Sequence, residues 1–236
     1  MKQLLKLFAV AALVSTTAIA GPEDNLRENL QKMLPEGMEI KSIAESPMPG
    51  VYDVQAGHQS LYVYSQDEFL MIGDVYNVER RVSLGDEKKN EKINAALSDV
   101  PESEMIVMGD LESERYVTVF TDTDCGFCQR FHRTIPDLAK GGMKVRYMMF
   151  PRAGLNSKSY EEAVSVWCAA DQGRAMTIAK TGGRVESATC ENPVAAQYKL
   201  GQEIGIRGTP TMVLDTGRII PGFVPADNLL TQAGMR

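Results

Sequence analysis

Two cysteines in a C-x-x-C arrangement are the residues of this sequence most able to do chemistry. Cys125 and Cys128 follow the apolar run 116–120, which is typical of a β-strand, after the short acidic turn 121–124. A helix that begins at Cys125 would place the first sulfur where unpaired backbone N–H groups and the helix dipole favour a thiolate. A thiolate attacks disulfides, and a second cysteine can resolve the mixed disulfide. The spacing therefore predicts a redox-active dithiol.

The same spacing is also half of a zinc site. A structural zinc ion needs a second pair of ligands at similar spacing, and neither Cys168 with Cys190 nor His58 with His132 supplies one. We therefore favour redox chemistry at this motif, and we expect neither a metal nor another cofactor.

The N-terminus indicates that the chain is exported. Two lysines flank the start of an apolar stretch, residues 7–14, and residues 18–20 have the A-x-A pattern of a cleavage site before Gly21. The apolar stretch is shorter than the about 20 residues that cross a bilayer. We interpret residues 1–20 as a signal peptide rather than a membrane anchor, and we expect no stable membrane association.

The charge of the chain argues against one class of partner. The formal net charge is −6, and it becomes −8 without residues 1–20, which hold two lysines and no acidic residue. An acidic chain without a basic patch does not attract nucleic acid. We therefore expect an exported, acidic protein that binds no nucleic acid.

We interpret the other two cysteines, Cys168 and Cys190, differently, because an oxidising compartment lets disulfides persist. Cys168 lies on the apolar stripe of residues 160–170 and is expected to be buried and inert, whereas Cys190 follows the polar stretch 181–189. A bridge between them would close 22 positions, which is worth roughly 3 kcal/mol in the chain-entropy model. We predict a permanent disulfide, with a second redox site as the alternative.

The mature chain is organised in two unequal parts. Residues 24–34 have the pattern of an amphipathic helix, and residues 38–84 consist of short apolar or alternating runs separated by turn residues, which indicates hairpins. A unit this small buries too little surface to be stable alone, and a second copy would complete its core. We therefore predict a β-rich dimerisation domain, 21–84, followed by a linker, 85–104, with a charged helix over 86–97.

From residue 105 onward, strands and helices alternate in the manner of an α/β domain. The expected elements are strands 116–120 and 144–150, a helix 125–140 interrupted at Pro136, helices 160–170, 172–180 and 194–204, a hairpin of 211–214 and 218–220, and a closing helix 225–233.

Five motifs resemble those of one known family. In order they are FTDTDCGFC, FPRAGLNS, VWCAA, GIRGTPT and PGFVP, behind a small exported β-rich domain. Together they resemble the DsbC family of bacterial periplasmic disulfide isomerases, over essentially the whole mature chain. The resemblance implies a thioredoxin-fold catalytic domain over 105–236 with a helical insertion, and a V-shaped homodimer with an apolar cleft. It also implies periplasmic location, misfolded exported proteins as substrates, and a DsbD-type membrane reductase that keeps the dithiol reduced.

The resemblance also implies a role for each cysteine. Cys125 matches the attacking cysteine and Cys128 the resolving one, while Cys168 and Cys190 match the structural disulfide of the family.

Thr209 and Pro210 match the threonine and cis-proline that face the active site in thioredoxin folds. Proline suits such a site because a cis bond costs only about 0.5–1 kcal/mol before proline. The loop would offer backbone hydrogen bonds to an extended substrate segment. An ordinary turn before a strand is the alternative.

Two positions depart from the family pattern, where Tyr and Thr are common and this chain has Phe127 and Asp124. The absence of the tyrosine hydroxyl at Phe127 should have only a mild effect. A carboxylate at Asp124 would oppose a thiolate unless it caps the helix. His132 lies within two helical turns of the dithiol, and we expect a surface or packing histidine rather than one that tunes the thiols.

Other functions share these features. An oxidase, a plain reductase or a DsbG-like oxidoreductase would have the same fold and motif, and a periplasmic holdase chaperone would not need the cysteines at all.

Overall fold

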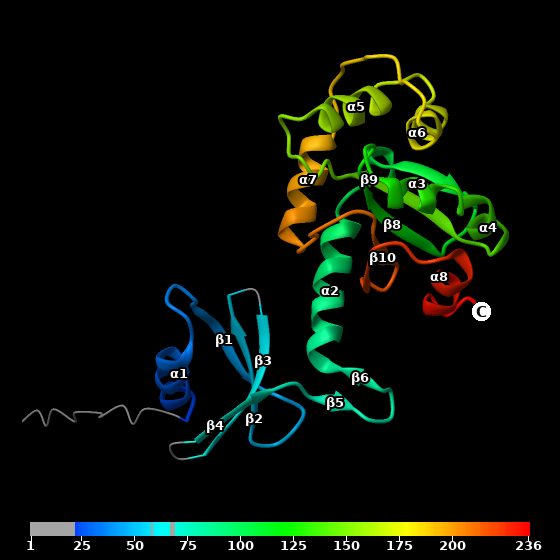
Figure 1. Ribbon diagram of the computed structural model, residues 1–236. Helices are drawn as coiled ribbons and strands as arrows, with labels where there is room; N and C mark the ends of the chain where they lie inside the picture. Colours follow the sequence, from blue (N-terminus) through cyan, green and yellow to red (C-terminus); the bar gives the residue numbers. More distant parts are fainter. Residues whose placement is uncertain (1–21, 58, 67–68) are drawn as a thin grey trace, which may run out of the picture. The chain divides into compact units, whose positions relative to one another are not determined.

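The computed structural model describes residues 22–57, 59–66 and 69–236 (Figure 1), so the predicted signal peptide lies outside the described residues, as does His58. The chain divides into two compact units, one up to Asn77 and the other from Val78 to Arg236. Each unit has a hydrophobic core of its own. No helix among the described residues is long and apolar enough to cross a membrane.

The first unit is a helix packed on an antiparallel four-stranded sheet. Helix α1 (Pro22–Met33) has acidic residues in its first turn and Lys32 in its last, which suits the helix dipole. Leu26 and Leu30 lie four residues apart on one face, and both are buried against Val54 and Val63 of the sheet. The strands are β1 (Ile40–Glu45), β2 (Val51–Ala56), β3 (Gln59–Gln66) and β4 (Phe69–Gly73), paired in that order.

The segment after β4 forms two short strands and a long helix. Within residues 38–84, where the sequence predicted hairpins, these strands are β5 (Tyr76–Asn77) and β6 (Val82–Ser83). Helix α2 (Leu84–Ser98) begins after Ser83, whose hydroxyl accepts the Asp86 N–H at 2.9 Å. Its buried residues Ile93 and Leu97 pack into the second unit, so this helix belongs to that unit.

The second unit is built on a mixed five-stranded sheet. The strands lie in the order β11 (Ile219–Pro221), β10 (Thr211–Leu214), β8 (Tyr116–Thr121), β9 (Lys144–Met149) and β7 (Ile106–Gly109). The pair β8 and β9 is parallel, and the other neighbours are antiparallel. The alternation of strands and helices in the sequence predicted this mixed α/β arrangement.

Helices cover both faces of this sheet, because alternate residues of each strand point to opposite sides. Val117 and Val119 of β8 share a core with α3, α4 and α8, whereas Phe120 faces the core that holds α2 and residues of α7 (Figure 1). The helices are α3 (Gly126–His132), α4 (Ile135–Lys140), α7 (Val194–Glu203) and α8 (Ala226–Gln232).

The predicted helix 125–140 is two helices, and the break falls at 133–134 rather than at Pro136. Proline has no N–H, and its ring would collide with the carbonyl four residues earlier. The first helix therefore ends before the proline, and Pro136 lies in the first turn of α4, where the missing N–H has no helical partner to lose.

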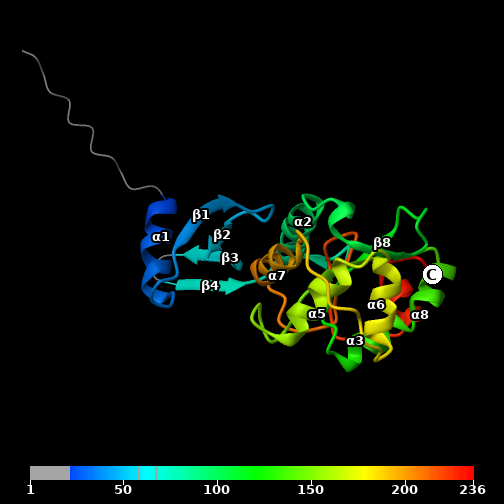
Figure 2. The same ribbon diagram turned by 90° about the horizontal axis from the view of Figure 1, so that it is seen from above.

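An insertion of helices lies between β9 and β10. It contains α5 (Lys158–Trp167), α6 (Gln172–Lys180) and α7. Helix α6 begins after Asp171, whose carboxylate accepts the Arg174 N–H at 2.9 Å. Helices α6 and α3 lie side by side (Figure 2), so the insertion packs directly against the helix that begins at the dithiol.

The turn between β10 and β11 lies close to the backbone of α2. Gly217 has a φ of +81°, and a Cβ at this position would collide with the Asn90 carbonyl oxygen.

We predict that Gly217→Ala lowers the free energy of unfolding of the second unit by at least about 2 kcal/mol, because it adds a collision to a left-handed backbone. Urea unfolding followed by fluorescence of the single tryptophan, Trp167, measures this unit.

Gly234 is the matched control, because its φ is +69° and a Cβ there would meet open space. Gly234→Ala should cost only about 1 kcal/mol, the cost of the left-handed conformation alone. Equal losses in the two variants would contradict a close contact at Gly217.

Candidate functional site

The two C-x-x-C cysteines lie where β8 gives way to α3. Cys125 has an extended backbone and is the N-cap of α3, and its sulfur accepts the Cys128 N–H at 3.3 Å. The side chains are 3% and 1% exposed, and both cysteines are free. The predicted placement of the first sulfur at a helix start is therefore present in the structure.

The loop before β10 lies against the first sulfur. The Thr209–Pro210 peptide bond is cis, and the Cys125 thiol donates to the Thr209 carbonyl oxygen at 3.3 Å. Sheet register explains this meeting, because Thr211 pairs with Phe120 at the end of β8 where the dithiol begins. Residues 84 positions apart thus form one site.

A hollow of about 240 Å³ runs along the same loop. Its lining is the segment 205–211 together with Ile219, Pro221 and Gly222. This segment includes Thr209 and Pro210, so the hollow adjoins the residue that contacts the Cys125 sulfur.

The surroundings act in opposite directions on the two thiols. Burial alone would raise the pKa of Cys125, but hydrogen bonds with Cys128 and the positive charge of Arg152 together lower it below its usual value. Burial raises the pKa of Cys128, and the hydrogen bond to Cys125 adds to this rise. Cys125 is therefore the better nucleophile of the pair.

An ion pair fixes the turn that precedes the dithiol. The buried Asp122 carboxylate accepts the Arg152 side-chain Nε–H at 2.9 Å and the Arg152 backbone N–H at 3.0 Å. Its other oxygen accepts the Asp124 N–H at 3.0 Å. The Asp124 side chain is exposed, and Cys125 rather than Asp124 caps the helix. Phe127 is also exposed, with the Arg130 guanidinium 5.2 Å from its ring centre.

His132 is a packing histidine. It is 7% exposed and stacks on Tyr147. Its Nδ1 lies 3.1 Å from the Tyr147 hydroxyl, and its Nε2 lies 3.1 Å from the hydroxyl of Thr177 on α6. Burial first, and the charge of Lys180 second, lower the pKa of His132 to about 4.

Lys180 is a residue near the dithiol that the sequence analysis did not select. It is 2% exposed, and its ammonium group donates to the Thr121 hydroxyl at 2.8 Å and to the Asp122 carbonyl at 2.6 Å. One feature of the sequence could have identified Lys180, namely its position four residues after Met176 on the buried stripe of the predicted helix 172–180.

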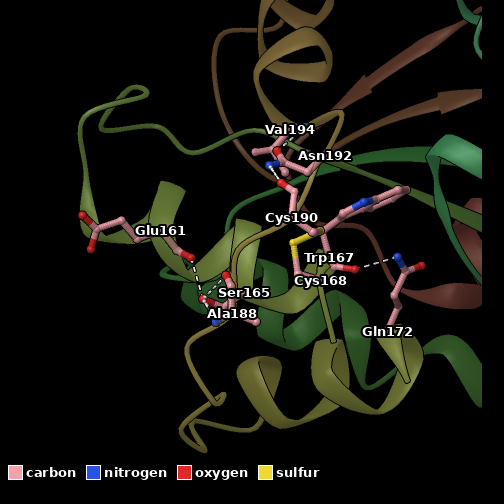
Figure 3. The surroundings of a disulfide bond; sticks show 9 residues. All are labelled: Glu161, Ser165, Trp167, Cys168, Gln172, Ala188, Cys190, Asn192 and Val194. Carbon is pink, nitrogen blue, oxygen red and sulfur yellow. Dashed lines mark hydrogen bonds between the residues drawn. A yellow bond between two sulfur atoms is a disulfide. The ribbon is translucent and has the colours of Figure 1, made fainter. Parts of the chain in front are cut away.

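Cys168 and Cys190 are joined by a disulfide (Figure 3), with an S–S distance of 2.01 Å. The expectation that Cys168 is buried was wrong. Helix α5 ends at Trp167, so Cys168 is the C-cap and is half-buried, while Cys190 is exposed in the loop before α7. Asn192 closes this loop by donating to the Cys190 carbonyl at 2.9 Å.

Within the described ranges, no group of three or more His, Cys, Asp or Glu side chains is arranged to hold a metal ion.

A free C-x-x-C pair at a helix start, opposite a cis-proline loop on a mixed sheet, defines a thiol:disulfide oxidoreductase of the thioredoxin class. Residues 103–233 match the family described as a thioredoxin-like domain, and residues 17–86 match the disulfide bond isomerase protein N-terminal domain. The chain belongs to the DsbC family of thiol:disulfide interchange proteins. The predicted family, fold and enzyme class are confirmed.

Named relatives cover nearly the whole chain. It is 30% identical to the thiol:disulfide interchange protein DsbC of Dickeya dadantii, over 98% of this chain and 94% of that protein. It is 32% identical to the DsbC of Escherichia coli strain K12, over 95% of this chain and 92% of that protein. A crystal structure of a disulfide interchange protein from Neisseria gonorrhoeae covers 57% of this chain and 98% of its own, with 29% identity and a TM-score of 0.51.

The pKa of His132 gives a testable pH dependence. The folded pKa of about 4 lies below the ordinary value near 6.5. Neutral His132 therefore contributes stability that is complete above about pH 6.5 and is lost as the pH falls toward 4. In a proton NMR titration, we expect the ring protons of His132 to change with a midpoint near 4. Tyr147→Phe, which removes one hydroxyl partner but keeps the ring burial, should leave the midpoint well below 6. A midpoint near 6.5 in the unaltered protein would contradict the burial that sets this pKa.

Proposed function

We propose that this protein is a periplasmic disulfide isomerase in which Cys125 attacks substrate disulfides and Cys128 resolves the mixed disulfide. The observation that carries the proposal is the position of the Cys125 sulfur at the start of α3, where it accepts the Cys128 N–H and lies against the Thr209–Pro210 loop. In this position the pKa of Cys125 is lowered, whereas that of Cys128 is raised. The first thiol is thereby prepared to attack, and the second stays protonated until it is needed.

The reaction follows from thiol–disulfide exchange. The Cys125 thiolate forms a bond to one sulfur of a non-native disulfide, the old S–S bond breaks, and the other substrate sulfur leaves as a thiolate. That thiolate can attack a different substrate disulfide, and the rearrangement ends with Cys125 released and no net oxidation. If the substrate stalls, Cys128 attacks the Cys125 sulfur and releases the substrate reduced.

Thr209 and Pro210 are proposed to bind substrate. Their loop contacts the Cys125 sulfur and lines the hollow of about 240 Å³. An extended segment lying along this loop would present its disulfide to Cys125, with backbone hydrogen bonds that do not depend on substrate sequence. Cys168 and Cys190 are proposed to form a structural disulfide that takes no part in the exchange.

Replacing each cysteine of the pair separates their roles. We expect Cys125→Ser to reduce the reactivation of a scrambled, multiply disulfide-bonded substrate to the uncatalysed rate, because the attacking sulfur is lost. Cys128→Ser should accumulate mixed disulfides that are visible on a non-reducing gel, because resolution is lost. Full reactivation by Cys125→Ser would overturn the proposal. Suppression of aggregation alone, equal in both variants and the unaltered protein, would indicate a holdase.

The proposed homodimer is supported by the edge strand of the first unit. Strand β4 pairs with β3 on one side and lies at the edge of the sheet on the other. Phe69 is 71% exposed and Met71 is 70% exposed, on a strand that presents backbone groups for further pairing. A second copy of the same strand, related by a two-fold axis, would cover this edge.

A charge on the edge strand tests the dimer. We expect Met71→Glu to weaken self-association by at least about tenfold, because a two-fold interface would bury the carboxylate twice without a partner. Sedimentation equilibrium at micromolar concentration measures the change. Met33→Glu is the matched control, since Met33 is 62% exposed on helix α1 rather than on an edge strand. A monomeric unaltered protein, or equal effects of the two variants, would argue against this interface.

Location and electron supply complete the proposal. The signal-peptide pattern of residues 1–20 supports export. An isomerase must start each cycle with its dithiol reduced, so in an oxidising compartment it needs a dedicated electron donor, for which a DsbD-type membrane reductase is proposed. Titration of the dithiol against glutathione would separate this function from that of an oxidase, whose disulfide is the stronger oxidant.

A further inference from the structure

Lys180 is a buried cation whose position is not explained by packing. Lysine side chains are almost never fully buried unless they are paired, and this one is 2% exposed. Its two hydrogen-bond acceptors, the Thr121 hydroxyl and the Asp122 carbonyl, are both neutral. Within the described part of the chain, no carboxylate forms an ion pair with it. The buried charge therefore lacks a permanent counter-charge.

The charged and titratable groups around Lys180 come from several elements. After the cost of burial, the strongest influence on its pKa is Cys128, followed by Asp122, Cys125 and Glu162. Asp122 is already paired with Arg152. The neighbouring His132 is neutral at ordinary pH, because its pKa is about 4. The ammonium group binds the turn 121–122 that leads into the dithiol, and α6 packs against α3, the helix that carries Cys128. The group best placed to balance the ammonium charge is therefore a thiolate of the dithiol, and foremost that of Cys128.

We propose that Lys180 is a positioning residue for resolution, whose buried ammonium group stabilises the Cys128 thiolate as it attacks. This inference rests on the function proposed above. Cys128 gives its thiol proton to water and forms a bond to the Cys125 sulfur, and the bond between Cys125 and the substrate sulfur breaks. The substrate sulfur leaves with the electron pair and takes a proton from water. Lys180 keeps its proton throughout.

The energetics of the pair agree with this role. Burial raises the pKa of the Cys128 thiol, and the charge of Lys180 is the largest of the influences that oppose the rise. Burial in turn lowers the pKa of Lys180, which the Cys128 charge opposes. The assistance therefore holds while Lys180 is protonated and is lost as the pH rises through the lowered pKa of Lys180.

The alternative role is a neutral anchor for the turn 121–122. An anchor needs only hydrogen-bond donors, which a glutamine side chain also has, whereas the proposed role needs a charge. Lys180→Gln and Lys180→Met both remove the charge, and only the first keeps donors. Lys180→Arg keeps both features. Lys158→Met, at an exposed lysine of α5, is the surface control.

The test uses an aromatic disulfide, 5,5′-dithiobis(2-nitrobenzoate), and the reduced full-length protein. Attack by Cys125 releases one coloured thiolate, and resolution by Cys128 releases the second, so the two steps are read as two phases. We expect Lys180→Gln and Lys180→Met to slow the second phase about tenfold at pH 7 and to move its pH midpoint upward by about one unit. The first phase should change less, and Lys180→Arg and Lys158→Met should behave like the unaltered protein.

A second phase in Lys180→Gln that matches the unaltered protein at every pH would overturn the inference and leave Lys180 as an anchor. Absence of the first phase in the unaltered protein would instead overturn the proposed function, so the two failures are distinguishable. If the charge-removing variants do not fold, the unaltered protein still gives an answer. The NMR-measured pKa of the Lys180 amine should fall when the dithiol is oxidised, and equal values in the two redox states would contradict the proposal.

Discussion

The cost of burying a thiolate is the constraint on which this active site depends. Cys125 and Cys128 are almost fully buried, and burial alone raises the pKa of both thiols. The fold offsets that cost with groups from separate segments: the backbone N–H at the start of α3, the guanidinium of Arg152 after β9, and Lys180 on α6. The sheet brings these segments together, because β8, β9 and β10 are neighbours.

The cost of burial is offset more fully at Cys125 than at Cys128. In the proposed mechanism, this difference decides which sulfur reacts first. Cys125 receives hydrogen bonds that lower its pKa, so it is the sulfur that is ionised first. Cys128 lies deeper and is opposed by burial, and its main support is the charge of Lys180. In the proposed mechanism, attack and resolution are therefore governed by different parts of the fold. A change in α6 can alter the second step while the first is left largely intact.

The sequence predicted the features that depend on local pattern. The bounds of α6 and β10 agree with the expected 172–180 and 211–214, because hydrophobic period and turn residues define such elements locally. The sequence did not predict the features that depend on tertiary contacts. The prediction that Cys168 is buried was wrong, because an apolar stripe does not reveal that the helix ends at the preceding residue, Trp167. Lys180 was missed because its environment depends on contacts with Thr121 and Asp122, which lie 59 and 58 positions earlier in the chain.

The disulfide and the buried cation are linked by chain topology. Helix α6 lies between Cys168 and Cys190, so the bridge closes the loop of 22 positions that carries Lys180. Closing a loop lowers the entropy that the segment must lose when it is ordered. The hydrogen bond between His132 and Thr177 then ties α6 to the helix that begins at the dithiol. In the proposed function, a covalent bond outside the reacting pair thereby helps to hold a charge near the dithiol. If that bond were reduced, side-chain packing and hydrogen bonds alone would have to offset the conformational entropy that the loop loses when it is ordered.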